Sequence, residues 1–545
     1  MPTIKLTNVT KRWKNFYAVD NLNLDIEDNA FITLLGPSGC GKTTTLRMIA
    51  GLETPTSGQI KIGDRVVYDS DAGINIPPNK RKVGFLFQNY ALWPNMTVYQ
   101  NIVFGLNNIN EEMPVKDFTA SRLQGLIDAL NKPKEIFKIV EDCKDKTGKV
   151  VEERVLLKFI DAFTISMYSA KDLYGYKLAD EAACEAKRNE LITQLDALKK
   201  SYKDRGQKLN DKFEVEEGGK VLEKKRKLSK EEIDLSVRRV SRIVKIGMFM
   251  DRYPSELSGG QQQRVAIART LAPEPQVLFM DEPLSNLDAK LRLEMRYELQ
   301  RIHLETGSTF VYVTHDQMEA MTLATKICLI NNGVLQQYEA PLNVYNRPNN
   351  LFVADFVGNP SINFVEAKGR QQGDYSFALE IFDGKKITFT PETPFSMPEW
   401  FAERDHKAAD EAAALEAAKN DKNFIEKANK DEVFNYKISL VEENDYLLKE
   451  EKVVTDEDFV IGIRPECLKI REGGLMEGVI YGAMPTGMES TIKIAVGKYL
   501  LTAVDFGNTL YQINDTKTFD IDSKNILLFD RKSGRVICNG SVKIN

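Results

Sequence analysis

Short apolar runs separated by polar turns dominate the first 107 residues. Runs with the length and composition of buried or half-buried strands lie at residues 4–9, 22–26, 32–35, 58–62 and 83–87. Residues 43–50 have helical spacing instead. Because strands alternate here with turns and helices, residues 1–107 predict the first part of an α/β domain.

The pattern changes between residues 108 and 235, which are rich in Lys, Glu and Asp and poor in proline. Residues 180–200 and 224–240 have helical spacing with charged faces. Apolar positions sufficient for a small core are Leu156, Phe159, Ile160, Phe163, Met167 and Tyr168. We therefore expect an inserted helical, charged subdomain over 108–235.

The α/β alternation resumes in residues 236–345, the second part of the same core. Residues 276–280 and 310–314 predict buried strands, and residues 288–305 predict a helix between them. The rest of the chain, 346–545, is rich in short strands at 386–389, 459–463, 478–480, 490–496 and 526–529. Such strands predict a small β-barrel or sandwich, interrupted by a second helical insertion at about 398–450.

Composition narrows the class of protein. A net charge of −5 over 545 residues gives no electrostatic reason to expect nucleic acid or an anionic membrane as partner. No stretch approaches the roughly 18 to 20 apolar residues that span a bilayer, and the N-terminus lacks a signal-peptide pattern. The six cysteines have no paired spacing. We expect a cytoplasmic protein that reaches any membrane through a partner.

A phosphate-binding pattern follows the third apolar run. It consists of Gly36, Pro37, Ser38, Gly39, Cys40, Gly41, Lys42, Thr43 and Thr44. A glycine-rich loop between a strand and a helix directs backbone N–H groups at anionic oxygens. Lys42 supplies a positive charge for the β- and γ-phosphates and Thr43 a hydroxyl for Mg²⁺. The sequence therefore predicts binding and hydrolysis of a nucleoside triphosphate.

Polar residues follow three other predicted strands. Gln88 comes after 83–87, Asp281 and Glu282 end the run 277–280, and His315 comes after 310–314. A carboxylate at a strand end can hold Mg²⁺, and its neighbour can polarise the attacking water. Each of these residues alone is common in solvated turns. The phosphate loop upstream favours the functional interpretation.

A second glycine-containing helix start lies far along the chain. Ser258, Gly259, Gly260 and Gln261 begin a helix-like segment, so they form a second N-terminal anion site. One nucleotide does not need two such sites in one subunit. The economical explanation is a pair of chains, each closing the nucleotide site of the other.

Together with Leu257 and the run 284–288 (Leu-Ser-Asn-Leu-Asp), these motifs resemble an ATP-binding-cassette ATPase over residues 1–107 and 236–345. The resemblance implies that Asp281 coordinates Mg²⁺ and that Glu282 is the general base. It also implies that Gln88 senses the metal, the water and the transporter contact. His315 would contact the γ-phosphate.

The resemblance further implies a dimer of cassettes, either a homodimer or a heterodimer. Ser258 and Gly260 would then reach ATP across the dimer, and Asp288 would link the two sites. Trp13 stands where the family has its adenine-stacking aromatic residue. Phe16, Tyr17 or a core role for Trp13 are the alternatives.

Segments outside the catalytic motifs resemble importers. Residues 89–98 are similar to the region of importer ATPases that receives a helix of the membrane subunit. Residues 345–348, 352–358 and 461–466 resemble the sugar-importer subgroup, whose C-terminal regulatory domain has an oligonucleotide/oligosaccharide-binding (OB)-like fold. Residues 358–364 favour carbohydrate or glycerol-phosphate uptake over polyamine, sulfate or metal uptake.

The resemblance thus implies a subunit on the inner face of the cell membrane, bound to integral permease subunits and served indirectly by an extracellular solute-binding protein. A chromosome-maintenance ATPase is the competing class. It would need sustained heptads in the insertion, which instead contains Gly218-Gly219 and no clean heptads. The expected fold is a P-loop α/β core with an enlarged helical subdomain and an OB-like β-rich domain.

Overall fold

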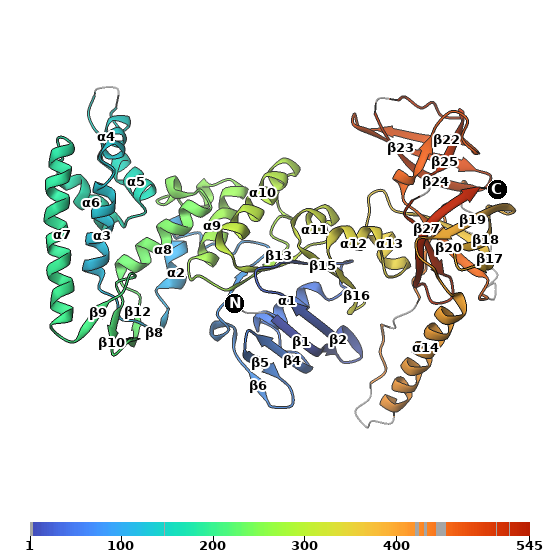
Figure 1. The fold of residues 1–545 in the computed structure, drawn as a ribbon, viewed down its shortest axis with the longest axis horizontal. Coiled ribbons are helices and arrows are strands. Elements are labelled where there is room, and N and C mark those ends of the chain that lie inside the picture. Colours follow the sequence, from blue (N-terminus) through green and yellow to red (C-terminus); the bar gives the residue numbers. More distant parts are fainter. Residues whose placement is uncertain are drawn as a thin grey trace. The chain divides into compact units, whose positions relative to one another are not determined.

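The computed structural model describes residues 4–145, 148–419, 425–429, 433–442, 454–507, 509–522 and 524–544. The chain divides into two compact units, Met1–Arg81 with Val311–Asn545 and Lys82–Phe310. Figure 1 shows the helices and strands of both units, with labels where there is room. Among the described helices, none is both long and apolar enough to cross a lipid bilayer.

An antiparallel sheet forms the N-terminal part of the first unit. Its strands, in spatial order, are β2 (Phe16–Ile26), β1 (Ile4–Trp13), β4 (Ser57–Ile62), β5 (Arg65–Asp69) and β6 (Ile74–Asn75). Buried and exposed side chains alternate along part of β1 and β2, as expected when one face is covered. The two edge strands of this sheet are β2 and β6.

A second set of strands in this unit carries the phosphate loop. β3 (Phe31–Leu35) is buried throughout and runs parallel to β15 (Lys326–Asn331), which pairs with β16 (Val334–Glu339). The loop leads from β3 to α1 (Lys42–Ala50). The remaining elements here are β14 (Thr309–Val313), α11 (Gln317–Leu323), α12 (Pro341–Asn346) and α13 (Leu351–Phe356). The strand and helix predicted around the loop are confirmed.

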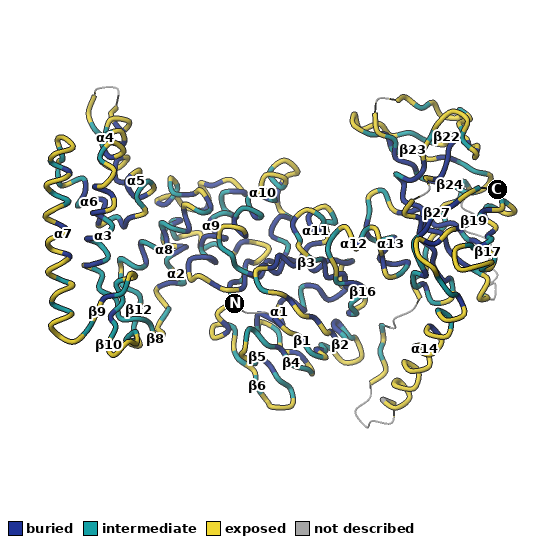
Figure 2. Tube along the Cα trace, viewed as in Figure 1, coloured by how far each residue is buried: buried dark blue, intermediate teal, exposed yellow. Residues whose placement is uncertain are grey.

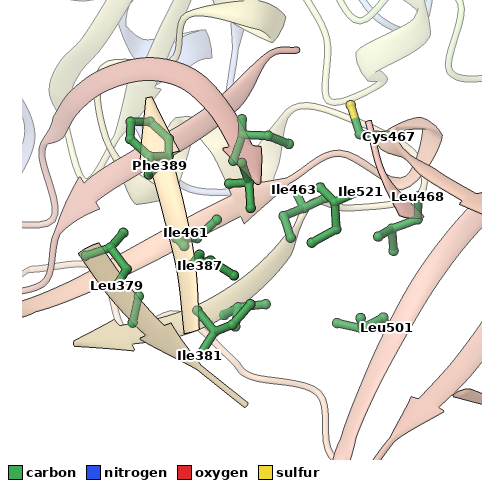
Figure 3. Packing of buried hydrophobic residues seen from close by; sticks show 14 of the residues in the cluster. Leu379, Ile381, Ile387, Phe389, Ile461, Ile463, Cys467, Leu468, Leu501 and Ile521 are labelled. Atoms are coloured by element: carbon green, nitrogen blue, oxygen red, sulfur yellow. The ribbon is translucent and has the colours of Figure 1, made fainter. Parts of the chain in front are cut away.

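The C-terminal strands form a closed barrel and an adjoining sheet. The barrel consists of β17 (Asn363–Gly373), β18 (Ser376–Ile381), β19 (Lys385–Pro391), β27 (Val536–Ile544), β26 (Ile526–Asp530) and β20 (Asp458–Ile463). The sheet consists of β21 (Leu468–Ile470), β25 (Thr516–Ile521), β22 (Met476–Pro485), β23 (Glu489–Val496) and β24 (Tyr499–Phe506). One apolar core serves both, with Ile387 and Ile461 from the barrel and Leu501 and Ile521 from the sheet (Figure 3).

Among its described residues, the second predicted insertion is helical only over α14. α14 (Met397–Lys419) contains the Ala-rich run 408–419, as predicted. The described residues after it, 425–429 and 433–442, contain no helix, so the prediction of helix to residue 450 is wrong for them. Residues 420–424, 430–432 and 443–450 lie outside the described residues.

The second unit holds the other part of the α/β core. β7 (Val83–Leu86) runs parallel to β13 (Val277–Asp281), with Leu86 opposite Met280. The helices of this core are α2 (Val98–Leu106), α8 (Lys230–Ile243), α9 (Gly259–Leu271) and α10 (Ala289–Thr306). Short 3-10 turns in the two units are Pro78–Lys80, Gly247–Phe249, Pro254–Glu256 and Pro465–Cys467.

Over its described residues, the first insertion consists of five helices and five short strands, all within the predicted range 108–235. Its helices are α3 (Phe118–Leu130), α4 (Pro133–Asp142), α5 (Glu152–Phe163), α6 (Met167–Gly175) and α7 (Glu181–Lys203). Its strands are β8 (Asn110–Pro114), β9 (Gln207–Leu209), β10 (Val215–Glu217), β11 (Lys220–Val221) and β12 (Glu223–Lys227). The predicted helix at 180–200 is confirmed as α7.

The helix predicted over 224–240 is wrong in its first part. Residues 223–227 form β12, which pairs with β8 so that Lys225 faces Glu112 and Arg226 faces Glu111. Opposite charges on facing strands stabilise the pair. The helix α8 begins only after Ser229, whose side chain and that of Glu232 form a reciprocal capping box.

Candidate nucleotide-binding and hydrolysis residues

The phosphate loop has a backbone shape that excludes side chains at two glycines. Gly36 has φ +150°, and a Cβ atom there would lie 2.1 Å from the Ile330 carbonyl oxygen. Gly41 has φ +105°, and a Cβ atom there would lie 2.1 Å from the Ala18 carbonyl oxygen. Gly41 is also the N-cap of α1 and provides no side-chain cap, which leaves the first-turn N–H groups of α1 to face an anion. The loop therefore fits a phosphate group.

Lys42 lies over this loop. Its Nζ donates to the carbonyl oxygens of Gly36 and Pro37, both at 2.8 Å, and lies 3.8 Å from the Cys40 Sγ. The side chains of Lys42 and Cys40 are both buried. Burial raises the pKa of the Cys40 thiol, although the nearby Lys42 ammonium partly opposes this. The cation is thus already placed over the loop where phosphate oxygens would bind.

Trp13 and Phe16 form the tip of the β1–β2 hairpin. They are cross-strand partners, and they are 48% and 42% exposed. The Lys11 ammonium lies 5.3 Å from the centre of the Trp13 ring. The core role considered for Trp13 is wrong, since its ring is half exposed, and stacking on a nucleobase remains a prediction.

His315 follows β14 at a strand end in the first unit. The Thr314 N–H donates to the Leu34 carbonyl oxygen at 3.3 Å, so His315 and Gly36 follow neighbouring strand ends. The Thr314 hydroxyl is fixed in turn by the buried Glu319 carboxylate at 2.7 Å. His315 itself is exposed. A contact from this imidazole to a γ-phosphate remains a prediction.

Gln88 and Glu282 come together in the second unit. Because β7 and β13 are parallel and in register, the residues after them meet at one edge. The Gln88 Nε2 donates to the Glu282 Oε2 at 3.5 Å and to the Ser285 Oγ at 3.3 Å. Asp281, the last residue of β13, is buried. This arrangement can hold and polarise a water molecule.

The backbone around this pair has positive φ angles at residues other than glycine. Glu282 has φ +44°, and Tyr90 and Ala91, just after Gln88, have φ +59° and +47°. Such conformations cost free energy and persist where surrounding contacts enforce them. The strain thus falls on the two loops that present Gln88 and Glu282.

Arg269 enforces one of these loops. Its guanidinium donates to the carbonyl oxygens of Ala91 and Tyr90, both at 2.7 Å. The buried Tyr90 hydroxyl donates to the Pro283 carbonyl oxygen at 3.2 Å and so links the two loops. Burial lowers the pKa of Arg269 and raises that of Tyr90 to about 12. No local sequence pattern identifies Arg269 as a functional residue, because nothing in a helical Arg indicates the distant carbonyl groups it binds.

The Ser258–Gln261 motif forms the start of α9. The Ser258 N–H donates to the Gln261 Oε1 at 3.0 Å within a capping box. Ser258 and Gly259 are exposed at this helix N-terminus. At the start of α10, the Asp288 carboxylate accepts from the Leu291 N–H at 2.9 Å, so Asp288 is the N-cap of this helix. Its role as a link between two nucleotide sites remains a prediction.

Binding of Mg²⁺ with the nucleotide remains a prediction. Among the described residues there is no group of three or more His, Cys, Asp or Glu side chains that could hold a metal ion. Mg²⁺ bound with a nucleotide does not need such a group, because phosphate and water oxygens supply most of its ligands. Thr43, Gln88 and Asp281 each carry an oxygen atom of the kind Mg²⁺ prefers, and their role as its ligands remains a prediction.

Comparison with known proteins identifies a family. A family model described as "ABC transporter" matches residues 19–285. The chain is 36% identical over 377 residues to the trehalose/maltose import ATP-binding protein of Thermococcus litoralis, covering 69% of this chain and 70% of that protein. It is 33% identical over 374 residues to the sn-glycerol-3-phosphate import ATP-binding protein of Psychromonas ingrahamii, covering 68% and 67%. It is 37% identical over 372 residues to a spermidine/putrescine import ATP-binding protein of Aster yellows witches'-broom phytoplasma, covering 68% and 76%.

Proposed function

Since this chain belongs to the ABC transporter family and is an ATPase of that family, we propose that it is the motor subunit of a membrane importer for sugars or glycerol phosphate. The observation that best supports ATP hydrolysis is the hydrogen bond between Gln88 and Glu282, which follow two parallel strands. We assign the cassette to residues 1–107 and 236–345, the first insertion to 108–235, and a regulatory domain to 346–545, with its own insertion at about 398–450.

The residues of the phosphate loop bind and orient ATP. Lys42 and the N–H groups at the start of α1 neutralise the β- and γ-phosphate oxygens. Thr43, Gln88 and Asp281 would hold Mg²⁺, which when bound would neutralise phosphate charge. The His315 imidazole donates a hydrogen bond to the γ-phosphate. Trp13 stacks on the adenine ring.

Glu282 accepts the proton of the attacking water as general base. The amide of Gln88, within 3.5 Å of this carboxylate, orients it and the water. Arg269 and Tyr90 keep the two loops in the strained conformations that present both side chains. Catalysis thus depends on positioning as well as on the basicity of one carboxylate.

A dimer completes each site in this proposal. The exposed Ser258 and Gly259, with Gly260, form a second helix N-terminus suited to an anion. Pairing two chains, as a homodimer or a cassette heterodimer, brings this motif to the ATP held by the other chain. ATP binding closes the dimer and hydrolysis reopens it.

Integral membrane permease subunits are the proposed partners, with an extracellular solute-binding protein acting through them and no nucleic acid partner. The supporting surface is aromatic: Trp93 and Phe104 are exposed, with ring centres 5.5 Å apart. The neighbouring segment is fixed at Ala91, whose carbonyl oxygen accepts a hydrogen bond from Arg269. An exposed aromatic pair next to a segment fixed by hydrogen bonds is typical of a surface that binds another protein. The chain would then work at the cytoplasmic face of the membrane.

The relatives named above act on sugars, glycerol phosphate and polyamines. Carbohydrate or glycerol-phosphate uptake agrees with the segment 358–364, and polyamine uptake is the second candidate. Co-purification from membranes, with identification of the bound permease and solute-binding protein, decides between them. Recovery of DNA in place of a permease would contradict the importer assignment.

Replacing the base tests the chemistry. Glu282→Gln keeps the size of the side chain but removes its basicity, so we expect kcat to fall by about 100-fold or more while ATP affinity is retained. Steady-state ATPase assays and ATP binding measure the two quantities. Glu274→Gln, at an exposed ion pair with Arg239, is the matched control and should turn over normally. Normal turnover of Glu282→Gln would contradict the assignment of the base.

A further inference from the structure

A segment of the C-terminal domain contacts the hairpin that carries Trp13. It consists of residues 425–429 and 433–442, which follow α14 and which we call the strap. The strap and the β1–β2 hairpin belong to the same compact unit. Neither the phosphate chemistry nor the predicted dimer accounts for this contact.

The Asn429 side chain binds the backbone of the hairpin at two atoms. Its Oδ1 accepts from the Tyr17 N–H at 2.9 Å, and its Nδ2 donates to the Tyr17 carbonyl oxygen at 2.8 Å. β2 is an edge strand of its sheet, so this amide takes the place of a neighbouring strand. One residue earlier, the Ala428 N–H donates to the Asn15 carbonyl oxygen at 2.9 Å.

The strap also contacts the side chain of Tyr17. The Tyr17 hydroxyl donates to the Ile425 carbonyl oxygen at 3.3 Å, and the Lys427 Nζ lies 5.6 Å from the centre of the ring. Lys427 forms an ion pair with Asp20 as well. Trp13, at the tip of the same hairpin, remains half exposed. The strap therefore engages Tyr17 and leaves the Trp13 ring accessible.

The same amide reaches towards the phosphate loop. The Asn429 Nδ2 lies 3.4 Å from the Asn332 carbonyl oxygen, in the turn between β15 and β16. The next residue of that turn, Gly333, donates to the Cys40 carbonyl oxygen at 3.1 Å. Gly333 also accepts from the Asp20 N–H at 2.9 Å. Asn429 is thus part of a hydrogen-bonded network that joins the strap, the hairpin and the phosphate loop.

The other end of the strap is fixed to the C-terminal domain. The Phe434 ring lies edge-on to Phe352, with ring centres 5.5 Å apart. Tyr436 packs in the same manner on Phe364, and its hydroxyl donates to the Glu366 carboxylate at 3.3 Å. Further along, the Leu500 N–H donates to the Ser439 carbonyl oxygen at 2.9 Å. The described parts of the strap therefore contact both the hairpin and the C-terminal strands.

We propose that Asn429 is a positioning residue for the adenine end of the nucleotide site, and that the strap makes ATP affinity depend on the C-terminal domain. This proposal rests on the proposed function, in which Trp13 stacks on adenine. By binding both polar backbone groups of Tyr17, Asn429 fixes the hairpin and so holds the Trp13 ring ready for the base. It contributes to nucleotide affinity and leaves the chemical step to Glu282.

Substitution of Asn429 in the full-length chain tests the proposal. We expect Asn429→Ala to raise the KM for ATP about fivefold, the loss of roughly one net hydrogen bond, with kcat within about twofold of wild type. Asn429→Asp keeps the acceptor for the Tyr17 N–H but loses the donor to the Tyr17 carbonyl oxygen. Its KM for ATP should therefore lie between those of wild type and Asn429→Ala. Asn435→Ala, at an exposed strap position, is the matched control and should leave KM unchanged.

A second readout reports on the hairpin directly. The chain has three Trp residues, so Trp93→Phe with Trp400→Phe leaves Trp13 as the sole indole fluorophore. In that background, ATP titration of Trp13 fluorescence should give a correspondingly weaker affinity with Asn429→Ala. The proposal is overturned if Asn429→Ala leaves both the KM for ATP and the ATP affinity from Trp13 fluorescence at their wild-type values. It is also overturned if Asn429→Ala lowers kcat and the melting temperature while KM is unchanged.

The same experiments separate this proposal from the proposed function. A wild-type chain that does not hydrolyse ATP would overturn both. If wild type is active and Trp13→Ala raises KM while Asn429→Ala does not, the function stands and the role of the strap is wrong. If Asn429→Ala lowers KM, the strap obstructs the site and the positioning role is likewise overturned.

Discussion

The two insertions of this chain are built in opposite ways. The first, between β8 and β12, encloses its own apolar core, whose buried members all lie between residues 120 and 215. Its entry and exit strands are paired with each other. The second begins with α14, whose described residues after Arg404 are exposed (Figure 2), and continues as the strap. The first insertion buries its own apolar surface, whereas the second depends on contacts with the rest of the chain.

This difference indicates different roles. An insertion with paired ends and its own core can be added to a fold with little effect on its host. The Ala-rich part of α14 has high helix propensity but no apolar stripe to bury, so its position depends on a few anchors. Changes in the first insertion should therefore affect its own stability, and changes in the second should affect the C-terminal domain or the nucleotide site.

The largest expected effect comes from the core of the first insertion. Phe159 is 1% exposed and packs against Phe163. Phe159→Ala should lower the free energy of unfolding by about 3–5 kcal/mol, because it leaves a cavity. Urea unfolding followed by far-UV circular dichroism measures this loss, while the KM for ATP should stay within about twofold. A large rise in KM would show that this insertion is coupled to the nucleotide site.

Leu415→Ala provides the comparison in the second insertion. Leu415 is half exposed on α14, so truncation should change stability by less than about 0.5 kcal/mol. An equal loss in the two variants would contradict the contrast between the insertions.

The anchor of α14 should give the next largest effect. Arg404 is buried against three carboxylates: its guanidinium lies 2.8 Å from Asp405, 3.0 Å from Asp456 and 3.3 Å from Asp530. Its pKa is raised, since the bonds to Asp405 and Asp456 outweigh burial, which alone would lower it. Arg404→Ala leaves Asp530, which is fully buried, without this cation.

We expect Arg404→Ala to cost about 3 kcal/mol of stability, the usual cost of removing one partner of a buried ion pair. Thermal unfolding of the full chain measures it. His406→Ala, at an exposed ion pair on the same helix, is the control and should cost less than about 1 kcal/mol. A similar loss in both variants would show that α14 has no specific anchor.

The smallest effect concerns the end of the first insertion and depends on pH. Burial alone raises the pKa of Glu232, but bonds from the Arg226 guanidinium and the Ser229 N–H lower it by more, to below its ordinary 4.5. A lowered pKa stabilises the fold above the unfolded-state value of 4.5, and this contribution is lost as pH falls through the lower folded value. Glu232→Gln should therefore cost about 1–2 kcal/mol near pH 7, with the difference shrinking below about pH 4.5.

Urea unfolding of both proteins from about pH 7 to pH 3 tests this dependence. Glu223→Gln, at an exposed position on β12, is the control and should show almost no loss at any pH. A difference for Glu232→Gln that is constant over the whole range would contradict the assigned role of its charge.

Local patterns predicted most of the elements near the site, because those elements are determined by nearby residues. β3, β7, β13 and β14 are short apolar runs, and each was predicted at its place in the chain. The errors lie where partners are distant. Residues 224–227 pair with β8, more than one hundred positions earlier, and charged residues give no local sign of such pairing.

The candidate site divides in the same way. Glycine at positions 36 and 41 and a polar residue after a buried strand are visible in the sequence, since local backbone geometry demands them. The bond from Arg269 to Tyr90 spans 179 positions and the bond from Asn429 to Tyr17 spans 412. Neither residue belongs to a local pattern that identifies its partner.

By itself the sequence determined the phosphate loop, the Gln88 and Asp281–Glu282 strand ends, the Ser258 helix start and the β-rich C-terminal domain. Each follows from the spacing of residue types within a few positions of the chain. Tertiary structure decided that Trp13 is exposed while Tyr17 is bound by the strap, and that Arg269 fixes the loop after Gln88. The physical reason is that these choices depend on hydrogen bonds and packing between segments that become neighbours only when the chain folds.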